Sequence, residues 1–242
     1  MAALKCEMGI TPTSEAARAR ETLQSLSLTG KVILQKVDQF LSEVQTLQVL
    51  AREAYKNEDF EATFRYLDMA YKIDNGPEIM TDLALLYEQG KGVGTDVDKA
   101  IELLTEAERK GSIRAKSRLG RMFLEGIGVP LDQAHAVTLL LEAAEQGDDE
   151  AMGFLALAYL GGQGVAQDKA RGVALMIKAA EAGNVEAQST LSLIYTQGGF
   201  GIDPNKEEAI KWARRAAQGG DAASIDFLDQ VAKDIAARFT KL

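Results

Sequence analysis

The side chains that could do chemistry are few and widely separated in this 242-residue sequence. The single cysteine, Cys6, leaves no pair for an intrachain disulfide and excludes a cysteine-based zinc site. The single histidine, His135, excludes a paired-histidine metal site, and the spacing puts no carboxylate or nucleophile within its predicted reach for general-base catalysis. We therefore expect no catalytic residue, no metal ligand and no cofactor.

Two further motifs look like ligand sites but lack the parts that those sites need. Gly90-Lys91-Gly92 and Gly126-Ile127-Gly128 are rich in glycine, but a phosphate-binding loop also needs a preceding strand and a Gly-Lys-Ser/Thr that opens a helix. The acidic run Asp148-Asp149-Glu150 lacks the glycine-centred alternation and the distant bidentate glutamate of a calcium loop. We interpret the glycines as turns and the acids as solvated helix starts, which the helix dipole favours.

The elements that would position any site follow an internal repeat. Each of four registers recurs at 36 residues, the last glycine arriving after a one-residue insertion: Tyr87, Phe123, Tyr159 and Tyr195; Ala115, Ala151, Ala187 and Ala223; Leu119, Leu155, Leu191 and Phe227; and Gly111, Gly147, Gly183 and Gly220. A fixed period of this length is typical of stacked supersecondary units.

Each unit reads as two helices joined by a glycine turn. In the second unit, Ala115, Leu119 and Phe123 recur at helical spacing, and the segment 126–130 contains two glycines and a proline that break the helix. Asp132 stands where a helix N-cap belongs, and Asp96 and Asp168 take that place in the neighbouring units. Gly147 is predicted to end the second helix as a left-handed C-cap.

This pattern resembles the Sel-one-like repeat family, a relative of the tetratricopeptide repeat. The resemblance is carried in the second unit by Ala115, Leu119, Gly120, Phe123, Gly126, Gly128, Val129, Asp132, Ala136, Leu139, Ala143, Ala144 and Gly147. It implies an all-α fold, a right-handed α-solenoid of helix-turn-helix repeats with four units of 36–37 residues plus caps. The departures are Ile79 and Gly172 in place of alanine, and a one-residue insertion carried by Gly199-Phe200-Gly201.

The expected organisation has four parts. Residues 1–30 form a flexible tail with a short helix that Ser14 caps, and residues 31–77 form a tetratricopeptide-like N-terminal hairpin. The four repeats occupy residues 78–220, as units 78–111, 112–147, 148–183 and 184–220. Residues 221–242 form a C-terminal capping helix, which is how a solenoid covers its end.

The helix expected from Lys31 to about Asn57 carries an apolar seam. Its members step alternately by four and three residues, as in a coiled coil: Ile33, Val37, Phe40, Val44, Leu47, Ala51 and Ala54. One interpretation is an intramolecular cap that packs on the neighbouring helix. The other is self-association, a homodimer formed through Ile33, Val37, Phe40, Val44 and Leu47.

The family resemblance also implies a partner site on the concave face, which the first helices form. Its inward positions lie one before and two, six and nine after the repeat alanine. The partner-binding residues expected from these positions are Leu85, Glu88, Arg114, Arg121, Leu124, Leu157, Leu160 and Leu193. We expect Arg114 and Arg121 to bind an acidic segment and the leucines to hold its apolar neighbours. The alternative is that both arginines pair with nearby glutamates such as Glu125.

Charge and the resemblance together define the expected function. A net charge of −9 disfavours nucleic acid and anionic membranes as partners. Neither a secretory signal nor a bilayer-spanning apolar run is recognisable, so we expect a cytoplasmic protein without membrane insertion. The expected function is a non-catalytic scaffold or adaptor that binds another protein or a peptide segment. The alternative is a dedicated inhibitor, an immunity protein or a chaperone-like regulatory partner of one bacterial protein.

Overall fold

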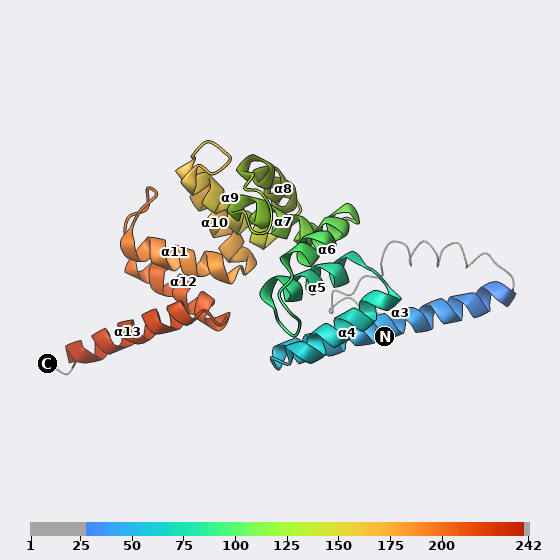
Figure 1. The fold of residues 1–242 in the computed structure, drawn as a ribbon. Helices are drawn as coiled ribbons and strands as arrows, with labels where there is room; N and C mark the ends of the chain where they lie inside the picture. Colours follow the sequence, from blue (N-terminus) through green and yellow to red (C-terminus); the bar gives the residue numbers. More distant parts are fainter. Residues whose placement is uncertain (1–27, 240–242) are drawn as a thin grey trace. The chain divides into compact units, whose positions relative to one another are not determined.

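The computed structural model describes residues 28–239, with the backbone alone at 28–38, 40 and 237–239. Within this range eleven helices follow one another, α3 to α13, and the one β-type pairing is an isolated bridge between Gly199 and Ile202. The expected all-α repeat fold is confirmed for the described chain (Figure 1). The chain falls into two compact units that part between Ala115 and Lys116.

The first unit contains the N-terminal hairpin and the first repeat. Its helices are α3 (Leu28–Lys56), α4 (Phe60–Ile73), α5 (Pro77–Gln89), α6 (Val97–Arg109) and the first residues of α7 (Ile113–Glu125). In this unit α3 packs on α4, α4 packs on α5, and α5 packs on α6. Apolar side chains such as Ile79, Leu86 and Leu104 are fully buried in this unit.

The second unit contains the rest of the array. It continues α7 and adds α8 (Gln133–Glu145), α9 (Asp149–Gly161), α10 (Lys169–Ala182), α11 (Val185–Gln197), α12 (Lys206–Gln218) and α13 (Ala222–Phe239). From α8 onward each helix packs on the next, and α13 also contacts α11. One buried cluster contains Leu160, Met176, Leu191 and Trp212. Alanines in the same cluster have short side chains, so the helices can lie close together.

The predicted helix ends are confirmed by their hydrogen bonds. The carboxylates of Asp96, Asp132 and Asp168 each accept a bond from the backbone N–H three residues later, at 2.8, 3.0 and 2.9 Å. The four glycines that close the units have positive φ, from 89° to 109°, which favours glycine at a helix C-terminus (Gly111, Gly147, Gly183 and Gly220). Local sequence signals therefore fix where these helices begin and end.

Two of the glycine loops that join paired helices also lie against the helix pair before them. At Gly92 and Gly164, φ is 71° and 67°. A β-carbon placed on either residue would collide with the backbone of an earlier second helix, at Phe60 for Gly92 and at Gln133 for Gly164. Glycine is needed at both positions because the backbones lie so close together.

The inserted residue shifts the register at the C-terminal end, which the expectation at a 36-residue spacing missed. Asn184 caps Ala187, and 37 residues later Asp221 caps Ser224 in the same manner, at 2.8 and 2.7 Å. Ser224 is buried, whereas Ala223 is exposed. The structural equivalents of Ala187 and Leu191 are therefore Ser224 and Leu228, not Ala223 and Phe227, because the insertion lies in the loop before α12.

The long N-terminal helix is present as α3, and part of its seam is used inside the first unit. Val44, Ala51 and Ala54 are buried in the α3–α4 pair, and Leu47 is half-buried. The side chains of Ile33, Val37 and Phe40, and the helix expected to begin at Ser14, lie outside what the structure describes. None of the helices between residues 28 and 239 has an apolar stretch long enough to cross a bilayer.

Candidate partner-binding face

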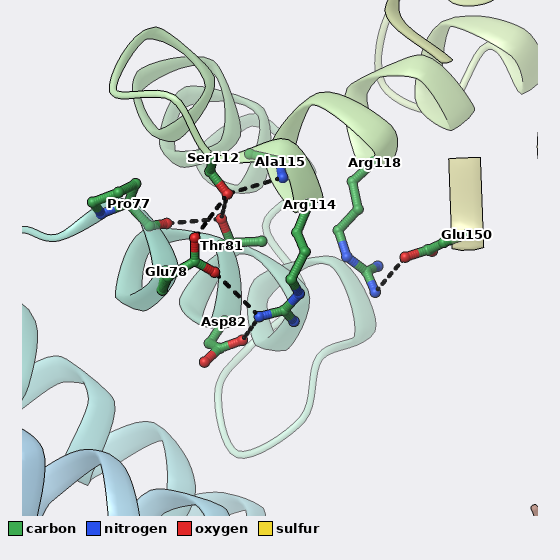
Figure 2. Close-up of polar contacts among 9 residues, drawn as sticks. All are labelled: Pro77, Glu78, Thr81, Asp82, Ser112, Arg114, Ala115, Arg118 and Glu150. Carbon is green, nitrogen blue, oxygen red and sulfur yellow. Dashed lines mark hydrogen bonds and ion pairs between the residues drawn. The ribbon is translucent and has the colours of Figure 1, made fainter. Parts of the chain in front are cut away.

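Arg114 is one of the two arginines expected to bind a partner, and it forms ion pairs with acids of the first repeat (Figure 2). Its Nη1 lies 3.0 Å from Asp82 Oδ1 and 3.6 Å from Glu78 Oε2. The alternative interpretation, pairing with nearby acids, therefore describes Arg114, although the acids come from the preceding repeat and not from Glu125. Asp82 was not among the expected site residues.

Arg118 makes the corresponding contact in the second unit with the charges exchanged. Its Nη2 lies 3.5 Å from Glu150 Oε2, and the two side chains are only 13% and 29% exposed (Figure 2). Asp82 and Arg118 both stand three residues after the repeat alanine position, and Arg114 and Glu150 both stand one residue before it. Successive repeats thus join through the same two positions, first as acid to base and then as base to acid.

The positions two residues after the repeat alanine also join neighbouring repeats. Thr81 is fully buried, and its hydroxyl lies 3.1 Å from that of Ser112, the residue that caps α7 (Figure 2). Ser189 donates to Asp221 at 3.0 Å in the equivalent place before α13. Hydrogen bonds from the side chain and backbone N–H of Ser224 and from Ser189 hold the pKa of Asp221 below its ordinary value, against the effect of burial.

Two of the expected partner-binding leucines belong to the core instead. Leu124 and Leu160 are each only 5% exposed, so neither can serve as an accessible contact. Leu160 packs closely against Gly172 of α10. A β-carbon on Gly172 would lie 2.7 Å from the Leu160 side chain, so the missing side chain lets Leu160 pack directly on α10.

The accessible row lies six residues after the repeat alanine. Leu157 on α9 is 37% exposed and Leu193 on α11 is 54% exposed, 36 residues apart. Arg121, in the same register on α7, is half-buried, with its guanidinium carbon 5.9 Å from the centre of the Phe154 ring. We call Arg121, Leu157 and Leu193 the Leu157–Leu193 face. In the first unit, Leu85 and Glu88 are half-buried.

Two hollows lie along this face. Leu157 borders a small one that is also lined by Glu150, Glu186 and Thr190. Thr190 also lines the second hollow, a depression of about 220 Å³ beside Leu193. The other walls of this depression include Ser189, Thr196 and Phe227. The two hollows are therefore lined by side chains of α9, α11 and α13. Exposed apolar surface lies between these helices.

The residues that could do chemistry remain apart in the described chain. Between residues 28 and 239, no group of three or more His, Cys, Asp or Glu side chains is gathered as a metal site would need. The His135 ring packs edge-on against Phe123, with 4.8 Å between centroids, and Cys6 lies outside the described residues.

A comparison with protein-family models decides the family. The Sel1 repeat model matches residues 77–112, 113–148, 149–184 and 185–221. The chain belongs to the Sel1 repeat family. These matches agree with the repeat units expected from the sequence to within one residue at each boundary. Sel1 repeat proteins generally mediate protein–protein interactions.

Solved structures of Sel1 repeat proteins share the fold. A Sel1 repeat protein from Oxalobacter formigenes is 28% identical, with a TM-score of 0.59 over 76% of this chain and 78% of its own. A protein from Klebsiella pneumoniae described as a Sel1 repeat protein is 20% identical, with a TM-score of 0.52 over 92% and 100%. The immunity protein Pa5087 from Pseudomonas aeruginosa is 20% identical, with a TM-score of 0.57 over 74% and 68%. Among curated proteins no match was found.

Proposed function

We propose that this Sel1 repeat protein is a non-catalytic scaffold or adaptor that binds a segment of another protein on the Leu157–Leu193 face. The observation that supports this proposal is the exposure of two leucines in the same register of consecutive repeats. The neighbouring first-helix positions are engaged within the array, at Thr81, Ser189 and Glu150 for example. Apolar side chains that the fold does not need in its core are typical of binding surfaces.

The chemistry of the face favours a partner segment with apolar anchors and a neighbouring acid. Leu157, Leu193 and the depression beside Leu193 offer an apolar strip. Arg121 places a positive charge over Phe154 at the edge of α9. Arg114 is left out of this proposal because Glu78 and Asp82 engage it.

The test begins with the full chain as bait in its native host, followed by mass spectrometry of the captured protein. The affinity of the purified partner is then measured for Leu157→Asp, Leu193→Asp and Arg121→Glu. Each change should weaken binding at least tenfold, about 1.4 kcal/mol, with helical content unchanged by circular dichroism. Leu157 and Leu193 are exposed, so these two sites should tolerate the substitutions.

The matched control is Glu181→Lys, an exposed charge reversal on the second helix α10. Glu142 is unsuitable as a control because its carboxylate lies 2.7 Å from Lys116 Nζ, so its reversal would also disturb an ion pair. Loss of binding in Glu181→Lys with retention in the two leucine variants would contradict this placement of the site.

A dedicated inhibitor, for example an immunity protein, is the second candidate. Its support is that two solved structures with this fold, Pa5087 and PA5088 from Pseudomonas aeruginosa, are described as immunity proteins. An inhibitor should bury a large area of one folded partner, whereas an adaptor should bind a short segment within the face. Binding by a synthetic peptide taken from the captured partner favours the adaptor; a requirement for the folded partner favours the inhibitor.

A further inference from the structure

The loop between α11 and α12 presents an aromatic residue in a backbone conformation that aromatic residues rarely adopt. This loop carries the one-residue insertion of the fourth repeat, and it extends as a narrow turn beyond α11 (Figure 1). Phe200 at its tip has φ +53° and is 41% exposed. The left-handed region is unfavourable for a non-glycine residue, because the β-carbon comes too close to the following carbonyl oxygen.

Hydrogen bonds show how the insertion is accommodated. In the first three repeats, the residue after the first loop glycine donates its N–H back into the first helix: Lys91 to Leu86, Ile127 to Met122 and Gln163 to Ala158, at 2.9–3.0 Å. In the fourth repeat, Gly199 and Ile202 instead exchange two backbone hydrogen bonds of 3.0 and 2.9 Å. Phe200 and Gly201 between them both have positive φ, as in a type I′ turn.

The loop then rejoins the regular pattern. Asn205 donates its backbone N–H to the Tyr195 carbonyl at 2.7 Å, as Asp168 does to Tyr159 at 3.0 Å. The extra residue is therefore confined to the tip and does not disturb the helices on either side. A closed two-residue turn fixes the backbone on both sides of Phe200.

The two glycines beside Phe200 have open space around them in the described part of the chain. Gly92 and Gly164 lie against the backbone of an earlier second helix, but a β-carbon on Gly199 or Gly201 would meet nothing within 4 Å. Phe200 keeps its strained backbone conformation although 41% of the residue is exposed to solvent. Strained conformations are concentrated at functional positions.

We propose that Phe200 is a recognition anchor that inserts into an apolar pocket on a folded partner protein. Buried aromatic side chains dominate many interfaces, and a turn that is already closed loses little entropy on binding. A single ring on a narrow tip suits a pocket, whereas the Leu157–Leu193 face suits a segment. An anionic bilayer is disfavoured by the net charge of −9 and by Asp203 three residues away.

The first experiment separates an anchor from a structural residue without knowing the partner. Phe200→Asn retains the left-handed conformation at lower cost, so the melting temperature should rise by roughly 2 °C. Phe200→Ala keeps the strain and removes the ring, so the melting temperature should stay within about 1 °C of the unmodified protein. A fall in both variants would show that the ring packs on its own chain, and would overturn the proposal.

The second experiment identifies what Phe200 touches. A benzophenone amino acid is placed at position 200 of the full chain in the native host, and at Leu131, an exposed apolar loop residue of the second repeat, as the matched control. We expect a cross-link to a different protein from position 200 and not from position 131. A cross-link to a second copy of this chain, to lipid, or to nothing overturns the proposal.

Binding of the cross-linked protein completes the test. Phe200→Asn and Phe200→Ala should weaken its affinity at least tenfold, while Phe200→Tyr should stay within threefold because it retains an aromatic ring. Unchanged affinity in Phe200→Asn overturns the anchor. This proposal rests on the proposed function only in that the chain binds a protein partner. If Leu157→Asp and Leu193→Asp do not reduce the affinity, the proposed binding face is wrong, but the proposal for Phe200 still stands.

Discussion

Single charged residues join one repeat to the next in this protein. The pair Arg118–Glu150 in the second unit is mostly shielded from solvent, whereas Arg114, with Glu78 and Asp82, is more exposed. Exposed ion pairs contribute roughly 0–1 kcal/mol, and loss of one partner from a shielded pair costs more because a charge is left in a poorly solvated place. The contact with Glu150 should therefore matter more to stability.

Arg118→Glu should lower the free energy of unfolding by about 1–3 kcal/mol, because it sets two carboxylates together. The double variant Arg118→Glu with Glu150→Arg should recover at least half of the loss, since the first interface places an acid and an arginine at these same positions. Urea unfolding followed by circular dichroism measures both values. No recovery in the double variant would mean that Arg118 acts mainly through other contacts.

The sequence predicted these residues unevenly. Asp132 and its equivalents were predicted correctly because an N-cap depends on local spacing alone. Leu124 and Leu160 were predicted to be accessible and are buried, because burial depends on how the opposing helix packs, which local spacing does not give. The pairing of Asp82 with Arg114 could have been found by comparing the charges of successive repeats at the two joining positions.

At the scale of elements, the loop glycines differ in what they are needed for. Gly126 and Gly164 have nearly equal φ, 72° and 67°. A β-carbon on Gly126 would make ordinary contacts with Leu131 at 3.6 Å or more, whereas on Gly164 it would collide with the Gln133 backbone. A substitution would therefore strain the backbone at both positions, but only Gly164 lies close to the backbone of another helix.

Gly126→Ala should cost about 1 kcal/mol from strain alone. Gly164→Ala should cost an additional 1–3 kcal/mol, roughly, because the loop must move away from the start of α8. Thermal unfolding monitored by circular dichroism compares the two variants directly. Equal losses would show that the loop moves freely and does not hold the second helix.

At the scale of the whole molecule, the period in the sequence predicted the all-α fold and the four repeats, because each unit repeats the same local signals. The strict 36-residue spacing misplaced Ala223 and Phe227, since one inserted residue shifts the equivalent positions to Ser224 and Leu228. The seam on α3 is a similar case. A heptad pattern predicts an apolar stripe but does not say whether the stripe meets the same chain or a second one.

Self-association through the seam stays a prediction, and Val44 offers the test. Val44 is buried in the first unit, so Val44→Asp should lower the free energy of unfolding by about 3 kcal/mol. The molar mass from light scattering should be unchanged if the seam is an intramolecular cap. A wild-type dimer that becomes a folded monomer in this variant would instead identify the seam as a subunit interface.

The exchanged charges at the joining positions have a consequence for the gene. A duplicated second repeat would bring Arg118 against a copy of Arg114, and a deleted second repeat would bring Asp82 against Glu150. Both products of unequal recombination would therefore bring like charges together where one repeat meets the next. The polarity of these two contacts therefore favours one order of the first three repeats.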